Sequence, residues 1–451
     1  MKRYAHSNDK EVINMTIPER AKAILWDEIH DMSSAPGVFA RNPDADFTRK
    51  RKLDFENLIR FIVTMQSGTT NHELLKYFDF SPNTISSSAF YQQRTKLLPT
   101  VFPYLLRQFN LHFPLEVYKG AYNLIACDGS EFNIARNPDD PDTFHPPNVI
   151  STRGFNMLHT ISLYELLSKR YLDCVIQPGR KKNEFQAICD LTDRYSYGGV
   201  PIFIADRGFS CYNYFAHASE KGIFFIVRAK DVNVKRLLKL DSLPDSIDSC
   251  ADIILARSKS KKKIKRPDLA EHYRYICPDV QFDYIKPGSG DEYPLSLRIV
   301  RFEVADGIFE NIITNLPTRK FPLEEIKCLY NMRWGIETSF RDLKYNLGAC
   351  NFHSKKVEYI KQEIWARLIL FNFCAVIISS IVVKNGDTKH VYQLNFAMAL
   401  KICHHFIRLS EHDPPPDVEA LIGSFTQPIR FERNFARQHR FQLPTSFLYR
   451  T

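Results

Sequence analysis

The sequence lacks closely spaced cysteine pairs. Its 10 cysteines are scattered singly from Cys127 to Cys403, and no C-x-x-C pair occurs among them. Structural zinc sites are commonly built from such pairs, so a structural zinc ion is not expected. The first ten residues, MKRYAHSNDK, also lack the apolar core of a signal peptide. We therefore expect free thiols in a reducing cytoplasm.

No apolar run is long enough for an ordinary membrane span. The most apolar run, LILFNFCAVIISSIVV at 368–383, contains Asn372 and two serines and follows Arg367. A span through a bilayer needs about 20 predominantly apolar residues. We therefore expect a buried helix here and no membrane association.

Basic residues outnumber acidic ones. The chain has 61 Lys and Arg against 51 Asp and Glu, which gives a formal net charge of +10. This excess favours a polyanionic partner, nucleic acid before an acidic membrane surface. Hydrophobic residues at 44% and charged residues at 25% are typical of a folded protein.

The pattern of the sequence changes several times along its 451 residues. Helical apolar spacing dominates at first, as in IPERAKAILWDEIHDM, whereas strands and helices alternate from about residue 120. We predict a helical N-terminal DNA-binding region (1–117), the first part of an α/β core (118–230), a β-rich insertion (231–318), the second part of the core (319–365) and a helical C-terminal region that is a candidate for dimerisation (366–451).

Two structures fit the pattern of residues 71–98. NHELLKYFDF predicts a short helix, a turn follows, and the segment with Gln92, Gln93 and Arg94 predicts a second helix. A helix-turn-helix would place this second helix on DNA, but a helical hairpin with a polar face gives the same pattern. The basic cluster TRKRK at 48–52 adds charge, or forms a solvated loop.

The first core segment alternates strands with helices. YNLIAC, FNMLHTISL and YLDCVIQ predict three strands, and a helix, a short buried strand, a second helix and the strand GIFFIVRA follow. This order, β-β-β-α-β-α-β, indicates an α/β sheet of mixed direction. Ribonuclease H-like domains share the order. We therefore predict a ribonuclease H-like mixed sheet, interrupted by the β-rich insertion and flanked by helical N- and C-terminal regions.

The insertion combines strands with a strongly basic run. HYRYICPDVQFDYI and YPLSLRIVRFEV predict strands, and ARSKSKKKIKR at 256–266 is rich in lysine and arginine. The basic run could grip DNA without sequence preference, with an affinity that falls steeply in salt. It could equally be a solvated loop.

Two aspartates follow buried strands. Asp128 lies in ACDGS and Asp206 in ADRGF, each directly after an apolar strand. A carboxylate at such a place needs a cation or hydrogen bonds, and open α/β sheets usually carry their sites at these strand ends. Either aspartate alone could be a turn or cap residue. If the strands are neighbours, the two carboxylates favour a divalent metal between them, and oxygen ligands select Mg²⁺ or Mn²⁺ over zinc.

A later segment carries a stripe of polar residues. In YNMRWGIETSFRDLK, helical periodicity places Tyr330, Arg333, Glu337 and Lys344 within an arc of about 60°, beside an apolar stripe. A simple i, i+4 ion pair would explain Arg333 and Glu337, but not the alignment of the other two. A third carboxylate beside the two aspartates would complete a two-metal site for phosphodiester chemistry. The cations and the phenol could then hold phosphates.

These motifs resemble a known family. The spacing Y-x2-R-x3-E-x6-K is similar to the signature of DDE-type insertion-sequence transposases of the IS-four group. ITNLP, FHSKK and QEIWARLILFN around it agree, as do ACDGS, ADRGF and SSSAFYQQRTKLL. The resemblance runs from about residue 50 to 410, and the long interval before the glutamate fits a family with an inserted β-domain.

The resemblance implies an activity and a set of site residues. Asp128, Asp206 and Glu337 would be catalytic and would bind two Mg²⁺ ions, or Mn²⁺. The enzyme would cleave the ends of an insertion sequence and join the 3′-hydroxyls to target DNA. It would act as a homodimer on double-stranded DNA, in the cytoplasm and associated with the nucleoid.

The same resemblance implies which residues contact DNA. The expected contacts to transposon-end DNA are Tyr330, Arg333 and Lys344, with Arg207 and Arg341 as further DNA-binding residues. Relatives that release their ends through a DNA hairpin use a tryptophan of the inserted domain, and this insertion has none. Tyr273, Tyr275, Phe282, Tyr284 or Tyr293 could stack on a flipped base instead, so the hairpin route stays open. Two other functions stay open, a ribonuclease H-like nuclease without strand transfer and a non-catalytic DNA-binding protein derived from a transposase.

Overall fold

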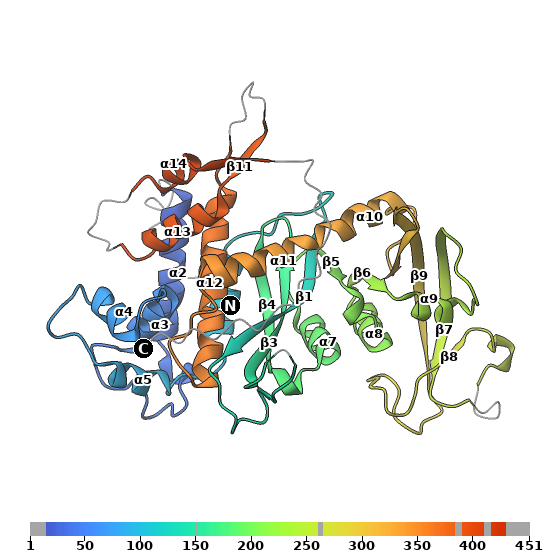
Figure 1. Cartoon of the computed structure of the whole chain (residues 1–451), viewed down its shortest axis with the longest axis horizontal. Helices are drawn as coiled ribbons and strands as arrows, with labels where there is room; N and C mark the ends of the chain where they lie inside the picture. The colour runs from blue at the N-terminus through green and yellow to red at the C-terminus, as the bar shows by residue number, and fades with distance from the viewer. Residues whose placement is uncertain (1–14, 150, 260–264, 384–389, 410–415, 430–451) are drawn as a thin grey trace, which may run out of the picture.

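A computed structural model describes residues 15–149, 151–259, 265–383, 390–409 and 416–429 (Figure 1). In this part of the chain the largest unit is a ten-stranded mixed sheet. Its strands are β1 (Tyr122–Ile134), β2 (Phe144–His145), β3 (Phe155–Glu165), β4 (Arg170–Pro178), β5 (Val200–Ala205), β6 (Phe224–Ala229), β7 (Ile247–Ala256), β8 (Tyr273–Tyr275), β9 (Glu292–Ala305) and β10 (Ile308–Thr314).

The predicted ribonuclease H-like core is confirmed. Five strands lie in the order β4-β3-β1-β5-β6, with β3 antiparallel to both β4 and β1, and with β1, β5 and β6 parallel. Almost every residue of β3 and of the short β5 is buried, because helices cover both faces of the sheet. Such strands read as nearly continuous apolar runs.

The strands of the insertion continue the core sheet. β10 pairs with β6, β9 with β10, β7 with β9 and β8 with β7, so one sheet runs from the core through the insertion. The strand predicted over 272–285 is mostly wrong, because β8 ends at Tyr275. Beyond it, the Arg257 guanidinium donates hydrogen bonds to several backbone carbonyls of a loop that contains Pro278. The division into domains stays a prediction.

Two helical layers enclose the core part of the sheet (Figure 1). One apolar core joins β1 to helices from both ends of the chain, and a second lies between the opposite face and three helices. The first group is α2 (Ile17–Ser33), α3 (Phe55–Thr64), α4 (Thr70–Tyr77), α5 (Ser87–Arg94), α6 (Val101–Leu111), α12 (Val357–Ser379), α13 (Phe396–Phe406) and α14 (Val418–Gly423). The second group is α7 (Glu184–Arg194), α8 (Tyr212–Glu220) and α9 (Asp231–Leu238). A small ribbon of β11 (Tyr392–Leu394) and β12 (Thr426–Pro428) lies beside α13.

The most apolar helix is a core element, as predicted. By length and composition α12 could cross a membrane, but 94% of its most apolar window is buried inside the protein. It packs against α2, α3, α6, α13 and β4. Asn372 within it is fully buried, and its side chain accepts a hydrogen bond from the backbone N–H of Tyr171 at 2.8 Å. Asn372, one of the polar residues that made a membrane span improbable, therefore helps to pack α12 against β4 of the sheet.

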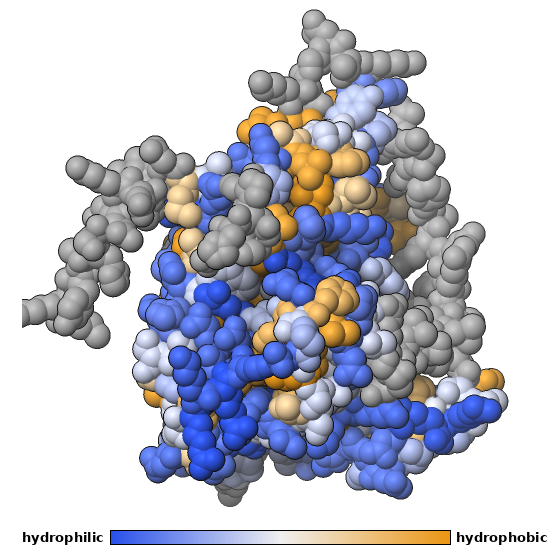
Figure 2. Space-filling view, turned by 90° about the vertical axis from the view of Figure 1, so that its left-hand side faces the viewer, coloured by the Kyte–Doolittle hydropathy of each residue, from blue (hydrophilic) through white to orange (hydrophobic). Residues whose placement is uncertain are grey.

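The helix pair α4 and α5 corresponds to the hairpin alternative. Nine residues separate the two helices, whereas a helix-turn-helix uses a turn of three or four residues. Gln93 and Arg94, on the second helix, are buried. The Lys52 ammonium donates to the backbone carbonyl of Asn83 at 2.9 Å, which brings the basic cluster against the connection between the helices. The face of the molecule on this side is largely hydrophilic (Figure 2).

Candidate active site

Strand pairing places the two aspartates side by side. In the parallel register of β1 and β5, Cys127 pairs with Ala205, so the next residues, Asp128 and Asp206, are neighbours where β5 ends. The prediction that Asp128 directly follows its strand is wrong, because β1 continues to Ile134 by pairing with β3, which places Asp128 within the strand. On the other side of β1, Asp128 lies opposite Ser162 of β3. The two side chains are partly exposed, at 21% for Asp128 and 37% for Asp206. The predicted neighbourhood of the two carboxylates is therefore present.

The segment predicted as one helix is divided. α10 (Leu323–Met332) is followed by Arg333, which caps its C-terminus. α11 (Trp334–Arg341) begins at the next residue, and a π-helical turn, η6 (Asp342–Asn346), follows. Arg333 itself has helical backbone angles, so the axis continues through the junction. A π turn contains more residues than an α turn, and such turns are frequent at functional sites. Positions beyond Arg341 therefore no longer follow the 100° spacing of the predicted stripe.

Because of the π turn, Lys344 no longer follows the helical spacing of the polar stripe. It lies within η6, and its ammonium nitrogen is 5.1 Å from the ring centre of Phe132 on β1. Burial lowers the pKa of Lys344. Tyr330, Arg333 and Glu337 thus precede the π turn, and Lys344 lies within it, over an aromatic ring.

The remaining stripe residues contact the carboxylates directly. Tyr330 donates from its hydroxyl to Asp206 Oδ1 at 3.3 Å. Arg333 donates from Nη1 to Asp128 Oδ2 at 3.2 Å and from Nη2 to Glu337 Oε1 at 2.8 Å. The i, i+4 pair is therefore present as part of a larger network. Arg333 thus joins the helical segment to the middle of β1, and Tyr330 joins it to the residue that follows β5.

Negative charge is concentrated at this point. The pKa of Asp128 is raised to about 6, chiefly by burial and also by the charges of Glu337 and Asp206, whereas Arg333 and the N–H of Gly129 oppose the rise. Burial also raises the pKa of Tyr330, with a contribution from Asp206. Although burial works to lower the pKa of Arg333, the tyrosine and the carboxylates around it raise that pKa overall. The raised pKa of Asp128 describes a carboxylate whose charged form a cation would stabilise.

A third strand contributes a cation that the sequence analysis missed. Arg228 is on β6, the strand next to β5, beside Asp206. Its Nη1 is 4.0 Å from Asp206 Oδ1 and its Nη2 is 3.3 Å from Glu310 Oε1. The signal was available, because Arg228 follows the apolar run of GIFFIVRA just as the aspartates follow theirs. Without the pairing of β6 with β5, however, nothing in the sequence connects Arg228 with Asp206.

Glycines of both aspartate motifs leave room for a pair on the opposite face. A Cβ on Gly129 would lie 2.9 Å from Cε1 of His159, and a Cβ on Gly208 would lie 3.5 Å from Oε2 of Glu184. His159 Nε2 and Glu184 Oε1 are 3.1 Å apart, and His159 is buried. The pair therefore packs behind the glycines of the two aspartate motifs.

The other two predicted DNA-binding residues are exposed. Arg207 directly follows Asp206, and Arg341 ends α11 one turn after Glu337. Both side chains are exposed to solvent, and each is close in sequence to one of the carboxylates. Their predicted contact with DNA stays a prediction.

The donor set suits a divalent metal, although the ligands are not arranged around one. Asp128, Asp206 and Glu337 offer only oxygen atoms, which Mg²⁺ and Mn²⁺ prefer. Within the described ranges, no three His, Cys, Asp or Glu side chains form a ready-made metal site. Here Arg333 lies between two of the three carboxylates. The three carboxylates thus have the oxygen ligands that a divalent metal prefers. Two of them, Asp128 and Glu337, are paired with Arg333.

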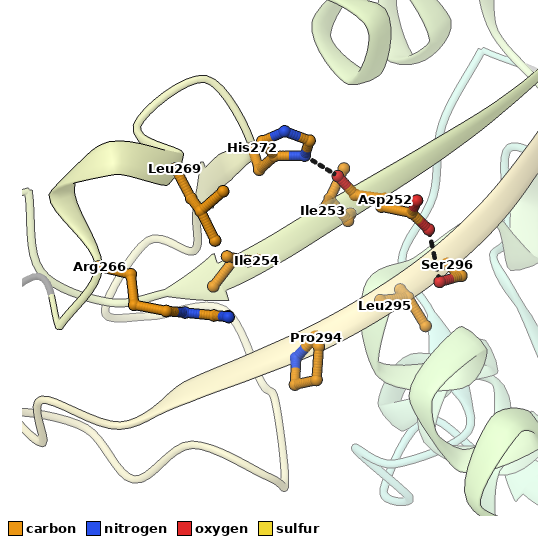
Figure 3. A pocket seen from close by; sticks show the side chains of 9 residues that line it. All are labelled: Asp252, Ile253, Ile254, Arg266, Leu269, His272, Pro294, Leu295 and Ser296. Carbon is orange, nitrogen blue, oxygen red and sulfur yellow. Dashed lines mark hydrogen bonds between the residues drawn. The ribbon is translucent and has the colours of Figure 1, made fainter.

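A cavity elsewhere is not connected with these residues. It has a volume of about 280 Å³ and lies in the insertion, between β7 and β9 and beneath the segment that leads into β8 (Figure 3). Asp252 is its one lining carboxylate, and it accepts a hydrogen bond from Ser296 at 2.6 Å. His272 is bound to the backbone carbonyl of Asp252 at 2.7 Å. None of the candidate site residues lines this cavity.

Comparisons with known proteins agree with these motifs. Residues 119–373 match a protein-family profile described as "Transposase DDE domain". The chain is 27% identical over 123 residues to the transposase InsG for insertion sequence element IS4 of Escherichia coli (strain K12). That match spans 27% of this chain and 27% of the relative.

A comparison of structures finds a remote likeness. A cryo-EM structure of the piggyBac transposase synaptic complex with hairpin DNA aligns over 97% of this chain and 90% of that one. The identity is 12% and the TM-score is 0.44. At this level the likeness supports no functional conclusion.

Proposed function

The chain belongs to the DDE transposase family, and from this membership we propose that it is a DNA transposase of an insertion sequence. Its reaction would be cleavage at the ends of the element, followed by joining of the 3′-hydroxyls to target DNA. The observation that carries the proposal is the meeting of Asp128, Asp206 and Glu337 at one edge of the sheet, in contact with Tyr330 and Arg333.

The three carboxylates are the proposed catalytic residues. Asp128 comes from within β1, Asp206 from the end of β5 and Glu337 from α11, an arrangement suited to binding two Mg²⁺ ions, with Mn²⁺ as a substitute. The raised pKa of Asp128 supports this role, because carboxylates crowded in a partly buried place gain from a cation. When bound there, divalent cations supply the charge that activates the attacking oxygen and stabilises the leaving oxygen.

The remaining residues of the site would hold DNA. Arg333 offers a planar fork for a phosphate, whereas Lys344 acts as a point charge. Tyr330 can donate to a phosphate oxygen, and the exposed Arg207 and Arg341 can extend the contact along the strand. With a formal net charge of +10 the chain suits a polyanion.

The partner is proposed to be double-stranded DNA, both at the element's ends and at the target. A homodimer would hold two ends together, with the C-terminal region as the candidate interface. An enzyme of this kind would work in the cytoplasm, associated with the nucleoid. The N-terminal helices would supply further DNA contacts, with the basic cluster at 48–52 as the candidate surface.

The experiment compares wild type with Glu337→Gln on DNA. Purified protein, Mg²⁺ and a labelled duplex with the sequence that flanks its own gene are assayed for nicking and for joining to a second duplex. Glu324→Gln is the matched control, because it makes the same change on the preceding helix at a side chain that is 79% exposed. We expect wild type and the control to cut and join, and Glu337→Gln to bind DNA without doing either.

Other outcomes point to other functions. Cutting without joining would identify a nuclease with the same site. Binding without any dependence on Mg²⁺, and without cutting, would identify a non-catalytic DNA-binding protein. Cutting by Glu337→Gln at the wild-type rate would show that the proposed set of carboxylates is wrong.

A further inference from the structure

One side chain holds two of the three proposed catalytic carboxylates at once. Arg333 reaches Asp128 through Nη1 at 3.2 Å and Glu337 through Nη2 at 2.8 Å. Its side chain is only 6% exposed, so these contacts are poorly screened by water. Arg333 sits at the junction of α10 and α11, whereas Asp128 is on β1. The guanidinium therefore offsets part of the negative charge of the site and fastens the helical segment to the sheet.

The contacts of Arg333 compete with any other cation. The Asp128 and Glu337 carboxylate oxygens that Arg333 contacts are among the oxygens a divalent ion would use. Asp206 is also near a cation of the protein, because Arg228 Nη1 lies 4.0 Å from it. A divalent ion that binds this set must first break the bridge that Arg333 makes. The free energy of breaking this bridge therefore weakens the binding of the divalent ion to the DNA-free protein.

Arg333 is nevertheless incompletely satisfied where it lies. Its Nε is buried and has no hydrogen-bond partner among the described residues. A buried donor without a partner is unfavourable. A guanidinium presents a fork of donors that matches a phosphate as well as a carboxylate. A phosphate group at the site would therefore offer Arg333 an alternative anion with equivalent geometry.

We propose that Arg333 is an exchangeable counter-ion that couples metal binding to DNA binding. In the free protein it pairs with both Asp128 and Glu337. When a DNA phosphate takes the guanidinium, these two carboxylates become available to divalent cations. This inference rests on the proposed function. It goes further by stating that the site binds the metal weakly without DNA and more tightly when DNA is bound.

Thermodynamic linkage makes the proposal quantitative. If DNA raises the affinity for the metal by some factor, the metal raises the affinity for DNA by the same factor, and such factors are commonly about 5- to 150-fold. Without the arginine the exchange cannot occur. An Arg333→Gln variant should therefore bind the metal more tightly than wild type in the absence of DNA, and DNA should change its metal affinity little.

The test is a binding measurement and needs no catalysis. Free Mn²⁺ is titrated by electron paramagnetic resonance against full-length wild type, Arg333→Gln and Arg333→Lys, with and without the duplex that flanks the gene. Lys327→Gln is the matched control, since it removes one positive charge from α10 at a residue that pairs with Glu324 and not with the site. Circular dichroism checks that each variant is folded.

We expect Arg333→Gln to bind Mn²⁺ about tenfold more tightly than wild type without DNA, and the control to match wild type. Arg333→Lys should lie between them, because a lysine keeps the charge but cannot bridge two carboxylates as a fork. Should Arg333→Gln fail to fold, an unchanged Mn²⁺ affinity in Arg333→Lys is enough to reject the proposal.

Two failures can be told apart. Equal Mn²⁺ affinities of wild type and Arg333→Gln, each raised equally by DNA, would overturn the exchange while leaving the metal site intact. The absence of Mn²⁺ binding in every variant, with or without DNA, would overturn the metal site and the proposed function with it.

Discussion

At the scale of single residues, buried charges join segments that are far apart in the sequence. Arg94 of α5 is fully buried and donates to Glu363 Oε1 of α12 at 2.9 Å, to Gln362 Oε1 at 2.6 Å and to the backbone carbonyl of Tyr359. Glu363 also accepts hydrogen bonds from the backbone and ring of His353. This network fixes the N-terminal helices to the core helix.

Breaking the network should be costly. Arg94→Met would leave Glu363 buried without its main cation, and removal of one partner of a buried pair costs about 3–5 kcal/mol of the free energy of unfolding. Arg41→Met is the matched control, since Arg41 pairs with Glu358 of the same helix but is 43% exposed. An exposed pair contributes about 0–1 kcal/mol. Urea unfolding at pH 7 measures both, and equal losses would contradict the proposed importance of burial.

Sequence patterns predicted the residues of the site better than their arrangement. Asp128 and Asp206 were predicted at the ends of apolar strands, and Glu337 from its place in a polar stripe. β5 does end before Asp206, but β1 continues past Asp128 to Ile134 because it pairs with β3 there. Lys344 was misplaced because the π turn depends on packing beyond the local sequence. Arg228 was missed because its partner, Asp206, lies on another strand. Contacts between strands depend on register, which the sequence of either strand alone does not define.

At the scale of elements, a histidine clamps a loop of the insertion to the core. His217 on α8 binds Asp193 through Nδ1 at 2.9 Å and Asp283 through Nε2 at 2.9 Å. Asp283 lies in the loop after β8, and Asn213 of α8 also holds it. Burial works to lower the pKa of His217, but the hydrogen bonds and charges of the two aspartates raise it overall.

This clamp should weaken as the pH rises. A protonated imidazole donates to both carboxylates, whereas a neutral one donates to a single partner. Since the folded-state pKa of His217 is raised, its contribution to stability is fully present below about pH 6.5 and is lost as the pH rises through the folded-state pKa. We expect amide hydrogen exchange of residues 277–285, corrected for intrinsic rates, to be several-fold faster at pH 8 than at pH 6.

Two variants test the origin of this pH dependence. In His217→Asn the exchange rates of the loop should be fast at both pH values. His272→Asn, elsewhere in the insertion, should keep the wild-type pH dependence, because His272 binds a backbone carbonyl and takes no part in the clamp. A loop whose pH dependence survives in His217→Asn would refute the role of this histidine.

Local periodicity predicted most core elements, but not how the insertion joins them. The strands and helices of the first core segment follow from apolar runs and their spacing. The pairing of β10 with β6 is a contact between distant segments that no short window contains. The loop after β8 was predicted as a strand because its aromatic residues have high strand propensity. In the structure Phe282 and Tyr284 pack instead with Tyr293 of β9 in an aromatic cluster.

At the scale of the whole molecule, one apolar core unites both ends of the chain with the sheet. It contains Leu25 of α2, Ala126 of β1 and Ile369 of α12, together with residues of α13 and α14. The core sheet and the insertion share a second core on the opposite face. The N-terminal helices have therefore no separate core of their own within the described residues. A region that shares its core should not unfold independently of the rest.

The tryptophans allow this to be tested. Trp26 is on α2, Trp334 on α11 and Trp365 on α12, so each reports on a different region. In three variants that keep one tryptophan and replace the other two by phenylalanine, fluorescence should give the same midpoint in urea, in agreement with circular dichroism. This follows because removing α2 would expose the buried faces of α12 and α6, which the remaining helices cannot cover. A lower midpoint for Trp26 alone would mean that the N-terminal helices separate first, and that their contacts with α12 contribute less than their burial implies.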